Sequence, residues 1–408
     1  MDNAIFATAL GITKPWFVDN LSFDTSKQLL TIRIDFEKGS QFSCPQTEGA
    51  HPVYDSRTKR YRHLNFFQHE CYLEVRVPRV KLPDGHITLI EPPWAGKLAG
   101  FTLLFEALIL ALCREMTFAA VARLVDMSWH QVHSMCTRYV DLALEQADLS
   151  ELRRVAIDET SRHKGQDYIT VVADADERKV IFVDEGHGAE TIAHFAAELL
   201  LHGSDPGRIE SASIDMSPAY IRGVTDYLPN ADITFDKFHV IANASKALDR
   251  TRAIEQRTDA SLKGLRWTLL KDRNSLSTEQ CTDLNAVIAA VVSKRTARAW
   301  VYREQLRAIL NRKQINVMRR MLHQWCTNVN RSKVEPMKKV AAMIRGHMEG
   351  IVQMARSRQT NGFIEALNGL FQAAKRKARG YGRLITIRTV LFLIAGKLDF
   401  AEINPHTA

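Results

Sequence analysis

The sequence lacks a long apolar run, a low-complexity segment and an internal repeat. Its most apolar stretch, residues 101–113, is interrupted by Glu106. It is also much shorter than the roughly 20 apolar residues that a membrane-spanning helix needs. That stretch therefore predicts a buried helix, and we expect no membrane partner.

Cysteine is scarce and dispersed, with six residues spread over a chain of 408. Disulfide-stabilised secreted domains are short and rich in cysteine, so this class is excluded. The chain begins Met-Asp-Asn and shows no basic segment followed by an apolar one, the pattern of a secretory leader. We expect a reduced, cytoplasmic setting.

Acidic residues are outnumbered, because 46 Asp and Glu stand against 55 Lys and Arg, and the formal net charge is +9. A basic chain favours an anionic partner, although ribosomal and membrane-surface proteins are basic too. Between Lys375 and Arg383 there are five cations and no acid, which favours phosphate contact. A length of 408 residues with 46% hydrophobic content predicts two to four domains with sizeable cores.

Two segments near the N-terminus alternate apolar and polar residues with period two, residues 29–36 and 72–80. This pattern is typical of half-buried strands. Pro92 and Pro93 then break the chain, and helical periodicity begins near Leu98. We predict a small β module over residues 1–92.

Residues 116–140 have the layout of a helix-turn-helix. Ser128 with Gln131 three residues later forms a capping box for the second helix. Its apolar side would be Val132, Met135, Cys136 and Tyr139, and the side chains left available to a DNA groove would be Trp129, His130, His133, Ser134, Thr137 and Arg138. Because a helical hairpin in any bundle looks the same, a purely structural role stays open.

From Val155 the pattern changes to short apolar runs, three in succession and then two more separated by helical segments, ending at Asp236. This order predicts a mixed sheet with covering helices. Residues 240–353 are helical, rich in Lys and Arg, and contain three tryptophans that would either stack on a flipped base or, more often, pack in a core, Trp267, Trp300 and Trp325.

Asp158 and Asp215 each follow an apolar run, where open sheets place their ligands. If the two strands are neighbours, the carboxylates repel one another unless a cation neutralises them, and oxygen ligands favour magnesium or manganese. The alternative is structural, with Asp158 capping a turn and Asp215 starting a helix. Glu159 should point to the opposite side of its strand and is not expected to be a ligand.

A third carboxylate, Glu365, lies on a predicted helix that Thr360 or Asn361 can cap and Gly380 can end. Positions 361, 365, 368, 372, 376 and 379 share one helix face, which carries the carboxylate, then amides, then cations. A metal ligand beside a row of phosphate-binding cations suits an enzyme that cuts DNA strands. A solvated surface helix would show the same pattern, so the hypothesis depends on partners for Glu365.

Four motifs together resemble the DDE transposases of the ISL3 family of bacterial insertion sequences. They are Ala-Ile-Asp158-Glu-Thr, Ser-Ile-Asp215-Met-Ser-Pro-Ala-Tyr, Phe-Asp236-Lys-Phe-His239-Val and Thr-Asn-Gly-Phe-Ile-Glu365-Ala-Leu-Asn-Gly. The resemblance implies an RNase H-like catalytic domain interrupted by a helical insertion, and it assigns a magnesium-binding triad to Asp158, Asp215 and Glu365. Asp236 and His239 would support the site, with Asp236 as reserve third ligand. A histidine that simply packs at a helix start is an equal alternative.

The family also implies an N-terminal zinc module with two Cys-Pro-x-Cys knuckles, from which this chain departs. The knuckles read Cys44-Pro-Gln-Thr and Leu82-Pro-Asp-Gly, so one thiolate of four remains. A tetrahedral zinc site needs four ligands, and we therefore expect no zinc and a Leu82 packed in its place.

The combined prediction is a multidomain α/β plus α chain. Its parts are a degenerate zinc-ribbon-like β module (1–92), a helix-turn-helix domain (93–150), an RNase H-like mixed-sheet catalytic domain (151–245 and 356–408) and an all-helical insertion (246–355). The resemblance implies binding to the element's terminal inverted repeats, metal-dependent cleavage at its ends and transfer of the 3′-hydroxyls to target DNA, by a dimer in a nucleoid-associated complex. Phosphates would be held by Lys375, Arg376, Arg379 and Arg383. The alternatives are a stand-alone metal-dependent nuclease or resolvase, and a non-catalytic DNA-binding relic.

Overall fold

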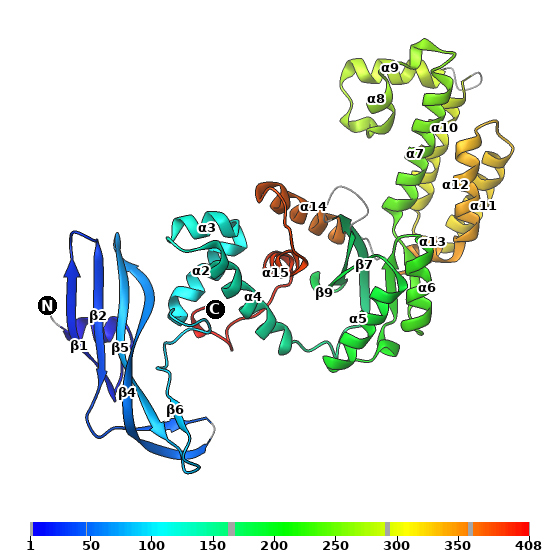
Figure 1. Cartoon of the computed structure of the whole chain (residues 1–408). Coiled ribbons are helices and arrows are strands. Elements are labelled where there is room, and N and C mark those ends of the chain that lie inside the picture. The colour runs from blue at the N-terminus through cyan, green and yellow to red at the C-terminus, as the bar shows by residue number, and fades with distance from the viewer. Residues whose placement is uncertain (1–2, 46, 162–167, 290–293, 358–361, 408) are drawn as a thin grey trace. The chain divides into compact units, whose positions relative to one another are not determined.

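The structure of the protein is a computed structural model that describes residues 3–45, 47–161, 168–289, 294–357 and 362–407. The chain forms two compact units (Figure 1). The first contains Met1–Gln146 together with Ile385–Ala408, and the second contains Ala147–Leu384. Among the described residues no helix is both long and apolar enough to cross a membrane.

A six-stranded sheet forms the N-terminal part of the first unit. Its strands are β1 (Trp16–Asp24), β2 (Leu29–Phe36), β3 (Gln41–Cys44), β4 (Thr47–Phe66), β5 (His69–Lys81) and β6 (Ile87–Leu89), preceded by helix α1 (Asn3–Ala9). The order is β1-β2-β5-β4-β3, with β6 on β5. The predicted alternation is present, since along β2 Leu30, Ile32, Ile34 and Phe36 are buried. Cys44, Cys71 and Leu82 lie in the same apolar cluster, with Leu82 packed as expected.

Four further helices belong to the described part of the first unit, α2 (Leu103–Glu115), α3 (Phe118–Leu124), α4 (Trp129–Glu145) and α15 (Leu384–Ala395). The predicted capping box at Ser128 and Gln131 is present at the start of α4. Sequence reasoning assigned α15 to the catalytic domain, but the structure groups it with the first unit from Ile385 onward. Polar contacts join α15 to α4, and they include an ion pair between Arg388 and Asp141 at 2.7 Å.

The second unit is built on a five-stranded mixed sheet in the order β11-β10-β7-β8-β9. The strands are β7 (Arg154–Ser161), β8 (Tyr168–Asp174), β9 (Lys179–Glu185), β10 (Ser211–Ile214) and β11 (Asp232–Phe235), with helices α5 (Ala189–Leu201) and α6 (Pro218–Tyr227) between them. Strands β7, β8 and β9 are antiparallel, whereas β10 and β11 run parallel to β7. This is the mixed sheet that the sequence predicted.

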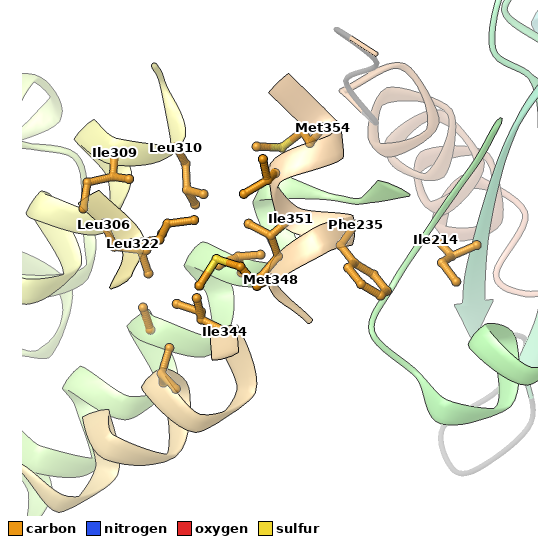
Figure 2. Close-up of a cluster of buried hydrophobic side chains, with 14 of the residues drawn as sticks. Ile214, Phe235, Leu306, Ile309, Leu310, Leu322, Ile344, Met348, Ile351 and Met354 are labelled. Atoms are coloured by element: carbon orange, nitrogen blue, oxygen red, sulfur yellow. The ribbon is translucent and has the colours of Figure 1, made fainter. Parts of the chain in front are cut away.

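A helical segment separates the sheet from the last helix of this unit. It consists of α7 (Lys237–Glu255), α8 (Arg266–Leu270), α9 (Thr278–Ala289), α10 (Arg295–Leu310), α11 (Ile315–Asn330), α12 (Glu335–Gly346) and α13 (Met348–Ser357), and α14 (Gly362–Lys377) follows. Its side chains share one apolar core with the sheet (Figure 2), in which Phe235 of β11 lies beside Met348 and Ile351 of α13. Trp300 and Trp325 belong to this core, while Trp267 is 63% exposed.

Candidate active site

Three aspartates lie level with one another on neighbouring strands of the second unit. The parallel register pairs Ser213 with Ala156 and Ile214 with Phe235. Continued along the strands, it places Asp215 beside Asp158 on one side and Asp236 on the other. Residues at equal register on parallel strands point to the same face, so the three carboxylates share one surface of the sheet.

The sequence suggested that Asp158 follows the end of its strand, but in the structure it lies inside β7. The strand continues to Ser161 because β8 pairs with it as far as Ser161 and Tyr168. Asp215 and Asp236 do follow their strands directly. The buried Asp158 carboxylate therefore comes from a position within a strand, whereas the other two carboxylates come from residues that follow strand ends.

The two aspartates that follow strand ends, Asp215 and Asp236, have local backbone partners. Oδ1 of Asp215 accepts a hydrogen bond from the backbone N–H of Ser217 at 2.9 Å. Asp236 caps α7 by accepting from the backbone N–H of Phe238 at 3.2 Å. The structural alternative that sequence reasoning kept open for Asp215 is thus present, because its carboxylate binds the backbone before α6. The capping role of Asp236 was not among the predictions.

The imidazole of His239 lies near two of the carboxylates. Its Nε2 lies 3.9 Å from Oδ1 of Asp158 and 4.0 Å from Oδ2 of Asp236. The imidazole is partly buried in the first turn of α7, where it faces the site.

Burial raises the pKa of Asp158 from its ordinary value of 3.8 to about 6. The neighbouring carboxylates of Asp215 and Asp236 also raise it, while His239 and the backbone N–H of Glu159 lower it. A carboxylate with a raised pKa favours a bound proton or another cation. The surface therefore has the electrostatic character of a cation site.

Glu159 faces the other side of the sheet, as expected. Its cross-strand partner is Thr170, whose hydroxyl lies 2.8 Å from that of Tyr220 on α6. Burial raises the pKa of Glu159, and the carboxylate of Asp215 adds to this effect.

Helix α14 docks its amide face on β7. Nδ2 of Asn368 donates to Oδ2 of Asp158 at 2.6 Å, and one turn later Nε2 of Gln372 donates to Oγ1 of Thr160 at 2.8 Å. Asp158 and Thr160 are two residues apart and so share a strand face. Sequence reasoning identified the amides on the helix face but not their partners, although their spacing of four residues was the available signal.

The structure describes the backbone of Glu365 as part of α14, one turn before Asn368, but its side chain lies outside what the structure describes. The expected caps Thr360 and Asn361 also lie outside the described residues. In the described part of the chain, no group of three or more His, Cys, Asp or Glu side chains is arranged to hold a metal ion. Whether Glu365 or Asp236 completes the triad stays a prediction.

The cations after the amides divide into two kinds. Nζ of Lys375 donates to the backbone oxygen of Ser161 at 2.7 Å, so this residue fixes α14 to β7 and is less available to phosphate than expected. Arg376, Arg379 and Arg383 are exposed. Those three remain candidates for phosphate contact.

The two helices α3 and α4 present a smaller surface than the sequence suggested. The predicted buried residues of α4 are buried, and Trp129, His130 and Arg138 are exposed. His133 and Thr137, however, pack on α15, with Nε2 of His133 3.0 Å from Oγ1 of Thr386 and the hydroxyl of Thr137 3.1 Å from that of Thr389. Both side chains are therefore less available to a DNA groove than expected, and their contact with DNA stays a prediction.

A buried carboxylate in the first unit escaped sequence reasoning. Glu106 is fully buried in α2 and accepts hydrogen bonds from the backbone N–H groups of Lys97 and Leu98 and from the hydroxyl of Tyr139. Nδ2 of Asn404 donates to the Tyr139 hydroxyl at 2.9 Å. The group therefore joins the chain before α2, helix α4 and the C-terminal segment.

Comparison with known proteins gives concordant matches over both units. Residues 155–390 match a family model described as a transposase, and residues 90–140 match the helix-turn-helix domain of transposase family ISL3. The chain is 27% identical to the transposase for insertion sequence element IS1001 of Bordetella parapertussis, over 81% of this chain and 82% of that protein. It is 26% identical to the transposase for insertion sequence element IS1557 of Mycobacterium tuberculosis, over 92% of each chain.

Proposed function

The chain belongs to the ISL3 family of transposases, and from this premise we propose that it is the DDE-type transposase of a bacterial insertion sequence. It would bind the terminal inverted repeats of its element, cleave phosphodiester bonds at the ends and join the freed 3′-hydroxyls to target DNA. The observation that carries the proposal is the level alignment of Asp158, Asp215 and Asp236 on one face of the sheet, beneath the amide face of α14. A protein that only binds DNA has no need of converging carboxylates.

The second unit supports an RNase H-like assignment for the catalytic domain. Its first three strands form an antiparallel meander, and the next two lie parallel to the first of them. The helices from α8 to α13 then stand between the sheet and α14 as an insertion. This order matches an interrupted catalytic domain whose last ligand comes late in the sequence.

Magnesium or manganese fits the donor set, because carboxylate oxygens are their preferred ligands. The raised pKa of Asp158 supports this, since the site is short of positive charge. Asp158 and Asp215 would hold the metal with Glu365, or with Asp236 in its place. When bound, such an ion supplies Lewis-acid activation of the attacking hydroxyl and charge stabilisation of the leaving oxygen.

The chain's own side chains would orient the reacting groups. Asn368 holds Oδ2 of Asp158, while Oδ1 accepts a hydrogen bond from the backbone N–H of Glu159 and lies 3.9 Å from Nε2 of His239. The exposed Arg376, Arg379 and Arg383 would hold phosphates of the DNA end, so that the strand lies along α14. In the first unit, Trp129, His130 and Arg138 would read the terminal repeat.

Assembly and setting follow from this function. Both element ends must be held together for strand transfer, which favours a dimer in the synaptic complex. Binding to chromosomal DNA would associate the protein with the bacterial nucleoid. Sedimentation of the complex with DNA tests the dimer, and footprinting tests the binding to DNA.

Cleavage and joining of a labelled element end, with magnesium, test the proposal. Asp158→Asn and Asp215→Asn should abolish both reactions while specific binding of the end persists. Glu159→Gln is the matched control, because it removes a carboxylate from the same strand on the opposite face, and it should stay active. Full activity of Asp158→Asn would refute the proposed chemistry.

The same assay identifies the third ligand. Glu365→Gln should be as inactive as Asp158→Asn, with Asp236→Asn reduced but measurable. The reverse order of activities would move the third ligand to Asp236.

A further inference from the structure

A large groove begins beside the candidate active site and follows α7 into the helical insertion. Its volume is about 1000 Å³. Asp236 is among its lining residues, and Phe238, Ile241, Ser245 and Asp249 line it at helical spacing. From Phe238 to Asp249 this face of α7 is about 16 Å long at 1.5 Å per residue. We call it the α7 groove.

The floor of the α7 groove is apolar although the groove is open to solvent. Phe238 is 56% exposed, and Ile241, Leu270, Leu310 and Met354 also line the groove. An exposed aromatic ring beside aliphatic side chains is a surface on which a flat apolar group can stack. The edge of this ring system meets His239, with the two ring centroids 5.9 Å apart, and more than half of Phe238 stays exposed.

The rim of the α7 groove carries an excess of positive charge. Three acidic residues line it: Asp249 pairs with Arg266 at 3.0 Å, Asp272 pairs with Arg307, and Asp236 lies 4.0 Å from Nε2 of His239. Four further cations line the groove and form no ion pair among the described residues. Lys237 donates a hydrogen bond to Oδ1 of Asn311, and the other three are Lys246, Arg312 and Lys313. The net charge available to a ligand is therefore positive.

We propose that the α7 groove binds a few unpaired nucleotides of the DNA strand that adjoins the scissile phosphate. Unpaired nucleotides offer both base faces for stacking and phosphates for cations, which matches an apolar floor with a basic rim. A double helix hides its base faces and would leave Phe238 without a partner. An apolar small molecule would give the cations of the groove no anionic partner.

The position of the groove supports this choice, and here the inference rests on the proposed function. Asp236 lies in the row of carboxylates and is also among the lining residues of the groove. A strand whose phosphate lies at the carboxylates has its next nucleotides at the mouth of the groove. The insertion would thus hold an end that has been opened for cleavage or left single-stranded after it.

Fluorescence anisotropy with a short labelled oligothymidylate and with a blunt duplex tests the proposal on the full chain, in chelator-containing buffer so that no cleavage occurs. Phe238→Ala should weaken binding of the oligothymidylate by roughly five-fold or more, the effect of losing one base–aromatic stack, with little change for the duplex. The double variant Arg312→Ala/Lys313→Ala should reduce the slope of log affinity against log salt by about 1.4 for the single strand.

Two matched controls remove similar side chains outside the groove. Tyr227→Ala deletes an aromatic side chain that is 41% exposed on α6, and Arg331→Ala/Lys333→Ala deletes two exposed cations after α11. Both should bind the oligothymidylate as the unaltered protein does. Equal binding by Phe238→Ala and Tyr227→Ala would overturn the inference, and so would an equal loss for duplex and single strand in Phe238→Ala.

Failure of this inference differs from failure of the proposed function. Single-strand binding that ignores Phe238, together with inactive Asp158→Asn, refutes the groove alone. Single-strand binding that depends on Phe238, together with a fully active Asp158→Asn, refutes the catalytic proposal and leaves the groove as a single-strand site.

Discussion

Replacement of Arg379 by glycine should stabilise the second unit while weakening its contact with DNA. Helix α14 ends in a Schellman motif, in which the N–H of Gly380 bonds to the oxygen of Lys375 at 2.9 Å and that of Arg379 to the oxygen of Arg376 at 3.1 Å. Arg379 occupies the left-handed position of this motif with a φ of 61°, a conformation that glycine adopts readily and other residues do not.

The magnitude follows from two opposing effects. A left-handed conformation costs a residue with a Cβ roughly 1–2 kcal/mol, and the greater freedom of glycine in the unfolded chain returns about 0.5–1 kcal/mol of this. Arg379→Gly should therefore raise the free energy of unfolding by about 0.5–1 kcal/mol. Loss of one phosphate contact should reduce the slope of log affinity for duplex DNA against log salt by about 0.9.

Arg376→Gly is the matched control, since it removes an exposed cation from the same helix at a position that does not have a positive φ. There glycine should lower the free energy of unfolding by roughly 0.5–1 kcal/mol, with the same change in salt slope. Arg379→Ala removes the cation but keeps the strained conformation, so it should lower affinity without stabilising the fold. Calorimetry of the full chain and DNA titrations at several salt concentrations measure both quantities. Equal melting temperatures for glycine and alanine at position 379 would refute the strain argument, and an unchanged salt slope would refute the phosphate contact.

Three further predictions concern buried polar groups. Asn368→Ala removes a charge-assisted hydrogen bond to Asp158 that is worth about 1.5–3 kcal/mol, so the cleavage rate should fall about 10–100-fold and the acidic limb of its pH profile should move to higher pH. Without metal, the raised pKa of Asp158 means that the folded state binds this proton more tightly than the unfolded state. Stability should therefore fall as the pH rises from about 4 to about 6, and Asp158→Asn should remove this part of the pH dependence in denaturant titrations. Tyr139→Phe leaves Glu106 and Asn404 each without one buried partner, which should cost the first unit roughly 1–3 kcal/mol in thermal unfolding.

Local sequence patterns were sufficient to predict those parts of the fold that depend on a short segment alone. The period-two strands, the capping box at Ser128 and Gln131, and the amide face of α14 could all be predicted, because each depends on residues a few positions apart. The carboxylates Asp158 and Asp215 could be found as well, since each ends an apolar run in the sequence.

What the sequence missed depends on partners far along the chain. The end of β7 is set by the length of β8, which is why Asp158 lies inside the strand. His133 and Thr137 have the spacing of exposed residues, but their partners on α15 come about 250 positions later. Gly380 signalled the end of α14, and only the backbone shows that Arg379 takes the left-handed position.

Helix α7 explains why the insertion and the carboxylates form one structure. It begins at the Asp236 cap, and its buried residues Val240, Ala244 and Leu248 continue the core of the sheet into the insertion. At the other end of the insertion, α13 approaches β11 so closely that a Cβ on Gly350 would lie 2.5 Å from the ring of Phe235, the residue before Asp236. The insertion therefore continues from Asp236 through α7 and packs against Phe235 through α13. Core substitutions within it should disturb the carboxylates even though they lie far from them in sequence.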